Sequence, residues 1–219
     1  MEKIVCFSGQ IASGKDESAD YLAMRLNEIL AAQCGAIACC GVREPERYEA
    51  EQHHRTAFGD AVKETYMRAF GVDRKFVEAW KRNDDPPEGY EETVRKSLMF
   101  IGDGFRRIKP SVWIDVLFRN HKGKNIVISD GRYYSEVDAV TKRKGINIAM
   151  WRPGHENDID HPSESQLKPE IDRLAKAMPQ GGPIEIESKF DWFLVNDGDL
   201  SDLQSKIDSH LISFIEEKI

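Results

Sequence analysis

Residues 4–16 read Ile4-Val-Cys-Phe-Ser-Gly-Gln-Ile-Ala-Ser-Gly-Lys-Asp16, and they carry the most specific structural pattern of the chain. An apolar strand leads into a loop bounded by Gly9 and by Gly14-Lys15, and a helical pattern follows. The apolar face of that helix is formed by Ala19, Leu22, Ala23, Leu26, Ile29 and Leu30. The order of strand, loop and helix, with the spacing G-x-x-x-x-G-K, is typical of a phosphate-binding loop in α/β proteins.

The loop residues have the chemistry that a polyphosphate requires. Glycines let the backbone curl so that successive N–H groups point at phosphate oxygens, and the start of the helix adds partial positive charge. Lys15 supplies a full charge for the β- and γ-phosphates. We therefore expect nucleotide phosphates to bind at Gly9, Ile11, Ala12, Ser13, Gly14, Lys15, Asp16 and Glu17.

The composition is that of an ordinary globular chain. It has 219 residues, of which 40% are hydrophobic and 32% charged, enough for one α/β domain with a full core. The formal net charge of −7 argues against a protein that coats nucleic acid. No apolar run approaches the roughly 18 residues that a membrane span needs, and the N-terminus has no signal-peptide pattern. We therefore expect a cytoplasmic protein with neither a membrane nor a nucleic-acid partner.

The four cysteines indicate a reducing compartment and no metal site. Cys6 and Cys39-Cys40 fall in expected buried strands, where thiols behave as small apolar residues, and no Cys-x-x-Cys pair occurs. Adjacent cysteines, and the adjacent His53-His54, give poor tetrahedral geometry for zinc.

Five apolar runs alternate with helical patterns, which predicts a doubly wound, mainly parallel five-stranded sheet with helices on both faces. The expected strands cover residues 4–8, 36–40, 126–129, 146–151 and 192–195. Expected helix N-caps are Asp60, Ser163 and Ser201, the last in a capping box with Gln204.

Two long segments interrupt this pattern within what we expect to be a single kinase domain. Residues 58–119 are mostly helical and are expected to form an insertion that binds the phosphate acceptor. Residues 152–190 contain several prolines and glycines and are expected to form a lid that excludes water. The core would then consist of residues 1–57, 120–151 and 191–219.

Charged residues occur where ligands bind in open α/β sheets. Asp130 ends a buried strand, where a carboxylate can hold Mg²⁺ directly or through water, and Arg132 follows two residues later. The alternative is an aspartate that caps a turn beside an exposed arginine. Asp16 stands where Ser or Thr usually ligates Mg²⁺.

Other candidate residues have equally simple structural alternatives. Arg106 and Arg107 end a helix and either clamp the acceptor phosphate or only stabilise the helix C-terminus. Arg152 either contacts the phosphoryl group during its transfer or lies on the surface. Lys63 points at substrate or at solvent, and Trp113 stacks on substrate or belongs to a core.

Several segments together resemble the bacteriophage-type deoxynucleoside monophosphate kinases, a branch of the P-loop kinases. In chain order they are residues 9–16, 57–63, 101–106 with Trp113-Ile114, 128–132 with Glu136, His161 with Ser163-Glu164, and 195–198. After Arg132 the family has Phe-x-Asn-Glu, whereas this chain has Tyr133-Tyr-Ser-Glu136, a difference that concerns base or sugar contacts.

The resemblance implies that the γ-phosphoryl group of ATP is transferred, with Mg²⁺, to a deoxynucleoside 5′-monophosphate, giving a deoxynucleoside diphosphate for dNTP synthesis. The implied catalytic residues are Lys15, Arg132 and Arg152, and the implied Mg²⁺ anchors, acting through water, are Asp16 and Asp130. The implied acceptor-binding residues are Asp60, Lys63, Arg106, Arg107, Trp113, Asp130, Arg132 and Glu136. A homodimer is implied by the family alone.

Two other functions fit the same residues. One is a different small-molecule kinase with a Gly-Lys-Asp loop, such as a phosphomevalonate kinase. The other is a nucleotide-dependent switch that transfers no phosphate.

Overall fold

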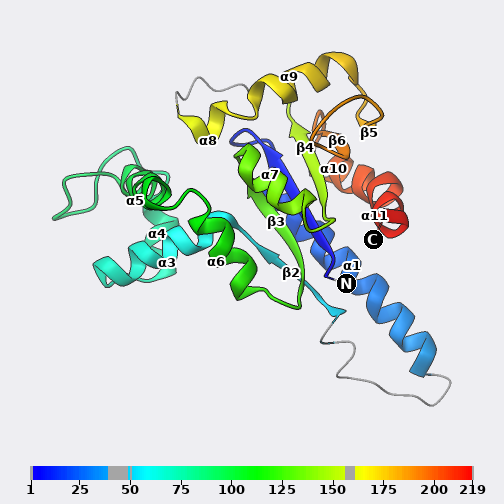
Figure 1. Ribbon diagram of the computed structural model, residues 1–219, viewed down its shortest axis with the longest axis horizontal. Helices are drawn as coiled ribbons and strands as arrows, with labels where there is room; N and C mark the ends of the chain where they lie inside the picture. Colours follow the sequence, from blue (N-terminus) through cyan, green and yellow to red (C-terminus); the bar gives the residue numbers. More distant parts are fainter. Residues whose placement is uncertain (1, 39–48, 50, 156–160, 219) are drawn as a thin grey trace. The chain divides into compact units, whose positions relative to one another are not determined.

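The computed structural model describes residues 2–38, 49, 51–155 and 161–218 (Figure 1). The chain divides into two compact units, one formed by Met1–Thr56 with His121–Ile219 and the other by Ala57–Asn120. Among the described helices, none is long and apolar enough to cross a membrane.

The larger unit is built on a sheet whose described strands follow the order β2-β3-β1-β4-β6-β5 (Figure 1). The strands are β1 (Ile4–Gly9), β2 (His53–Thr56), β3 (Asn125–Gly131), β4 (Ile146–Trp151), β5 (Gly182–Pro183) and β6 (Trp192–Val195). All neighbours pair in parallel except β5, which is antiparallel to β6. The prediction of an α/β fold with a mainly parallel sheet is confirmed.

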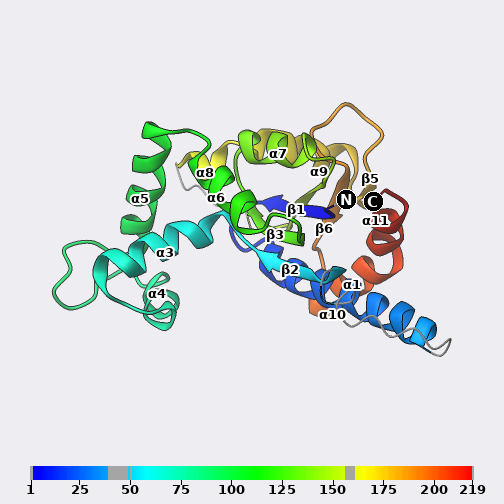
Figure 2. The same cartoon turned by 60° about the horizontal axis from the view of Figure 1, so that its bottom comes forward.

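Helices cover both faces of this sheet (Figure 2). One face carries α1 (Lys15–Ala38), α10 (Leu200–Lys206), the π-helix η1 (Ile207–Leu211) and α11 (Ile212–Lys218), and the other α7 (Tyr134–Thr141) and α9 (Lys168–Ala177). Side chains alternate along β6, so Trp192 and Leu194 join the core beneath α1, whereas Phe193 and Val195 join the core beneath α9. Both faces are therefore buried, which explains why β6 is a continuous apolar run.

The smaller unit is helical and has a small core of its own. It consists of α3 (Phe58–Phe70), α4 (Arg74–Trp80), α5 (Val94–Ile108) and α6 (Val112–Asn120). Tyr66, Val77 and Val94 are buried together at its centre. This unit coincides closely with the predicted insertion at residues 58–119, and its binding role remains a prediction.

The strand predicted at residues 36–40 is wrong. Residues up to Ala38 continue helix α1, and Cys39 and Cys40 lie outside the described residues. The fifth parallel strand is instead β2, whose sequence His-His-Arg-Thr has no apolar run. With β5 added, the described residues form six strands rather than the five expected.

Part of the segment predicted to lie outside the sheet belongs to it. Ile171 and Leu174 of α9 are fully buried in the core that includes Phe193, and β5 extends the sheet. The short helix α8 (Pro162–Ser165) precedes α9. The predicted helix caps are also wrong, because the observed N-caps are Ala57, His161 and Asp199 rather than Asp60, Ser163 and Ser201.

Candidate functional site

The loop between β1 and α1 curls tightly and depends on its two glycines. Ala12 and Gly14 both have left-handed backbone angles, with φ of 60° and 95°. A Cβ atom on Gly9 would lie 2.6 Å from the Met150 carbonyl oxygen, and one on Gly14 would lie 2.7 Å from Asn196 Nδ2. Neither position has room for a side chain, so both glycines are required by close approach of β4 and of Asn196.

Asn196, directly after β6, holds this loop in place. Its Nδ2 donates a hydrogen bond of 3.0 Å to the Ser13 carbonyl oxygen, and the side chain is buried. Asn196 was not among the predicted site residues. Its position at the end of a buried strand is the same signal that identified Asp130, and this signal could have found it.

Replacing Asn196 with alanine is expected to destabilise the protein. The substitution leaves a buried carbonyl without its donor, which costs about 1–3 kcal/mol and lowers the Tm by roughly 3–10 °C for a chain of this size. Thermal and urea unfolding followed by circular dichroism measure the change. The control is Asn83→Ala, because Asn83 is exposed; equal Tm values for the two variants would contradict the role given to Asn196.

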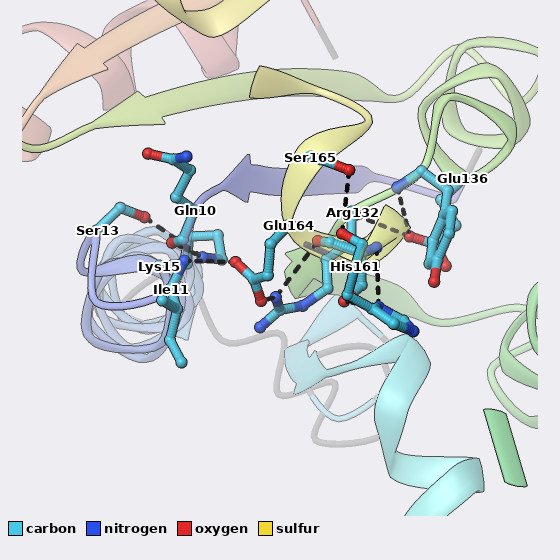
Figure 3. Close-up of polar contacts among 11 residues, drawn as sticks. Gln10, Ile11, Ser13, Lys15, Arg132, Glu136, His161, Glu164 and Ser165 are labelled. Carbon is cyan, nitrogen blue, oxygen red and sulfur yellow. Dashed lines mark hydrogen bonds and ion pairs between the residues drawn. The ribbon is translucent and has the colours of Figure 1, made fainter. Parts of the chain in front are cut away.

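Lys15 is buried and bends back onto its own loop (Figure 3). Its Nζ donates to the Gln10 carbonyl oxygen and lies 3.3 Å from Ser13 Oγ. Burial, together with the nearby Arg132 cation, lowers the pKa of Lys15 from 10.5 to about 7. A phosphate group at the loop would favour the charged amine, so anion binding and protonation of Lys15 are coupled.

Asp16, at the start of α1, contacts residues of two neighbouring strands. It forms an ion pair with Arg55 of β2 and accepts a 2.9 Å hydrogen bond from Ser129 Oγ of β3. Burial acts to raise the pKa of Asp16, but the Ser129 hydrogen bond and the Arg55 cation outweigh it and lower the pKa. Asp16 is therefore ionised at neutral pH. Arg55 could not have been found from the sequence, because β2 itself was not recognisable.

The carboxylates Asp16 and Asp130 are the residues that could hold Mg²⁺. Asp130 is half-buried in β3, directly after Ser129, the hydrogen-bond donor to Asp16. The described residues contain no group of three or more His, Cys, Asp or Glu suited to a metal ion. Two hard oxygen donors fit Mg²⁺, which usually keeps several waters and takes its other ligands from substrate phosphates.

Glu164 joins α8 to the loop and to Arg132 (Figure 3). Its Oε1 forms an ion pair with Arg132 Nη1, and its Oε2 accepts a 2.9 Å hydrogen bond from the Ile11 backbone N–H. Arg132 Nη1 is also 3.5 Å from the Ser163 carbonyl oxygen. The structure thus brings Arg132 to the loop, and Glu164 is the residue that connects them.

Glu136 fixes the backbone that carries Arg132. Its buried Oε2 accepts hydrogen bonds from the backbone N–H groups of Arg132, at 2.8 Å, and Tyr133, at 3.2 Å. A substrate contact through this oxygen would compete with both hydrogen bonds.

Two other predicted site residues lie at the ends of elements of the larger unit. Arg152 is half-buried directly after β4, and Glu17 is exposed in the first turn of α1.

In the smaller unit, Asp60 and Lys63 belong to one charged network between α3 and α4. Asp60 pairs with Arg74 at 2.8 Å, and Lys63 pairs with Glu78 at 2.9 Å. Arg74 Nε lies 3.4 Å from Glu78, which links the two pairs. These cations and carboxylates are partly neutralised by one another.

The other three candidates of this unit lie on α5 and α6. Arg106 Nη1 is 3.7 Å from Asp103, and Arg107 is exposed near the end of α5. Trp113 is buried, and its Nε1 donates a 2.9 Å hydrogen bond to the Gly102 carbonyl oxygen. Trp113 therefore occupies a core position, the simpler of the two alternatives for this residue.

No family model matches the chain. The chain is 25% identical, over 130 residues, to an Acanthamoeba polyphaga mimivirus protein named "Putative deoxynucleotide monophosphate kinase"; the match covers 51% of this chain and 67% of the relative. Two solved structures show weak similarity. The first is a sugar kinase from Janibacter sp. HTCC2649, with a TM-score of 0.37 and 11% identity, and the alignment covers 97% of this chain and 95% of that chain. The second is a "putative kinase" from Chloroflexus aurantiacus, with a TM-score of 0.36 and 13% identity, and the alignment covers 97% of each chain.

Proposed function

We propose that this protein is a kinase that transfers the γ-phosphoryl group of ATP to a deoxynucleoside 5′-monophosphate. The observation that carries the proposal is the glycine-bounded loop between β1 and α1, with Lys15 buried in it. The name of the mimivirus relative supports both the kinase class and the nucleotide acceptor. A bacteriophage-type enzyme in particular rests on the sequence resemblance alone.

In this proposal, the loop N–H groups and Lys15 bind the ATP phosphates. Arg132 and Arg152 neutralise negative charge on the transferred phosphoryl group in the transition state. The acceptor is already an anion, so positioning and charge stabilisation supply the rate without a strong general base. Mg²⁺ anchored by Asp16 and Asp130 would neutralise charge on the phosphates.

The acceptor site and the lid are further parts of the proposal. Acceptor binding is assigned to Asp60, Lys63, Arg106, Arg107, Asp130, Arg132 and Glu136, as the sequence resemblance implies, and the buried Trp113 is left out. The lid is assigned to the segment that contains α8, within residues 152–190.

A coupled assay of ADP release tests the function. The purified protein is given ATP, Mg²⁺ and one acceptor at a time: the four common deoxyribonucleoside monophosphates, the four ribonucleoside monophosphates and phosphomevalonate. We expect turnover with at least one deoxynucleotide. Turnover with phosphomevalonate alone would identify a different small-molecule kinase, and slow hydrolysis that no acceptor accelerates would identify a switch.

Nucleotide affinity is expected to fall as the pH rises above 7. Lys15 has a pKa of about 7, and only its charged form attracts phosphate, so affinity should fall once the pH exceeds that value. Between pH 7.5 and 9, where phosphate is fully ionised, affinity should fall by up to about tenfold per pH unit. Isothermal titration calorimetry with ADP, in two buffers of different ionisation enthalpy, measures the affinity and the accompanying proton uptake.

The Lys15→Arg variant is the control for this titration, because a guanidinium stays charged throughout the range. Its affinity should not change between pH 7.5 and 9. A pH-independent affinity of the unsubstituted protein, without proton uptake, would contradict the coupling between Lys15 and phosphate.

A further inference from the structure

Glu164 is bound to two groups that the proposed function assigns to phosphate. The Ile11 N–H belongs to the loop whose amides are expected to hold phosphate oxygens, and Arg132 is expected to neutralise the transferred group. Both donate to the same carboxylate, one to each of its oxygens. A phosphate oxygen would make the same two kinds of contact.

The burial of this carboxylate indicates that the arrangement is specific. The Glu164 side chain is only 4% exposed, whereas that of its partner Arg132 is 27% exposed. Burying a carboxylate is costly unless charge and hydrogen bonds compensate, and here they are supplied by Arg132, by the Ile11 N–H and by the field of Lys15. The phosphate loop thus contributes directly to holding α8.

We propose that Glu164 is a positioning residue that occupies the place of a phosphate group at the loop, and that nucleotide phosphate must displace it to bind. The inference rests on the proposed function, because it assumes that the loop binds phosphate. On displacement, the Ile11 N–H and Arg132 exchange one anionic partner for another, so Arg132 turns to phosphate only when phosphate is present. The same exchange frees α8 from the loop.

This competition predicts that one kinetic constant changes and another does not. Glutamine at position 164 keeps an oxygen that can accept from the Ile11 N–H but carries no charge to oppose phosphate or to hold Arg132. Glu164→Gln should therefore lower the KM for ATP and leave kcat within about twofold, since Glu164 has already left Arg132 when phosphate is bound. A side chain that only stabilised the fold would reduce the active fraction and leave KM unchanged.

The decisive experiment measures phosphate binding without turnover. Isothermal titration calorimetry compares the unsubstituted protein, Glu164→Gln and Glu164→Ala, each with inorganic tripolyphosphate and with a non-hydrolysable ATP analogue. Both variants should bind each ligand about tenfold more tightly, because a nearby like charge has been removed. Thermal melts verify that each variant is folded, and the alanine variant decides the result if the glutamine variant does not fold.

The charge-matched control is Asp172→Asn on the neighbouring helix α9. Asp172 pairs with Lys168 at 2.7 Å, so its loss changes the net charge equally within the same segment of the chain. Its affinity for tripolyphosphate should equal that of the unsubstituted protein.

The outcomes separate this inference from the proposed function. Equal or weaker tripolyphosphate binding by the folded Glu164 variants, in a protein that binds and uses ATP, overturns the inference and leaves the kinase function in place. An equal gain in affinity for Asp172→Asn also overturns it, since the effect would then be one of general charge. If the unsubstituted protein binds neither tripolyphosphate nor the ATP analogue, both proposals are overturned.

Discussion

Replacing Lys15 with alanine should lower the rate of phosphoryl transfer by about 10³-fold, a loss of about 4 kcal/mol of transition-state stabilisation. The substitution removes the full charge nearest the bound phosphates, and backbone amides supply only partial charges in its place. The fold should survive, because the buried amine has a lowered pKa and is itself a cost to stability. The measurement is kcat from ADP release with a saturating deoxynucleoside monophosphate.

Lys142→Ala is the matched control, because Lys142 is an exposed lysine at the end of α7. Its rate should stay within twofold of the unsubstituted protein. A near-normal rate of phosphoryl transfer by Lys15→Ala, in a protein whose circular dichroism spectrum is unchanged, would contradict the proposed role of the loop in catalysis.

Replacing Arg132 with alanine should weaken acceptor binding and slow transfer together. We expect the KM for the deoxynucleoside monophosphate to rise about tenfold or more and kcat to fall about 10²-fold, since a guanidinium that contacts phosphate in the transition state is lost. The KM for ATP should change far less. Steady-state kinetics with each substrate varied in turn measure all three constants.

Arg119→Ala serves as the control for charge, because Arg119 is exposed near the end of α6. Stability must be measured as well, since removing Arg132 leaves the buried Glu164 carboxylate without its cation. If ATP affinity alone suffers in a folded Arg132→Ala protein, the assignment of Arg132 to the acceptor is wrong.

Much of the fold could be predicted from the sequence because most of its strands are buried on both faces. Such strands appear as continuous apolar runs, as at residues 126–129 and 192–195. The apolar run at residues 36–40 led to the wrong prediction of a strand, because a short apolar run at the end of a helix cannot be distinguished from a strand by sequence. The edge strand β2 was not predicted because its polar sequence shows no alternation of apolar and polar residues. Only its pairing with β3 defines it as a strand.

The residues of the candidate site likewise fall into those that the sequence predicts and those that it does not. Residues within the loop could be predicted from spacing, since the loop, Lys15 and the helix are contiguous in the chain. Glu164 and Arg55 could not, because each becomes part of the site through a contact with a residue distant in sequence. Such contacts depend on how α8 and β2 pack, which no local pattern records.

The hydrogen bond from Asn196 to the Ser13 carbonyl oxygen joins positions 183 residues apart. During synthesis the loop residues are therefore made long before the amide that holds them. A nascent chain that has not yet reached residue 196 carries the full motif while its loop is unsecured. Nucleotide binding should begin only after Asn196 has been added and has packed against the loop, and a product truncated before residue 196 should carry the motif but bind phosphate weakly.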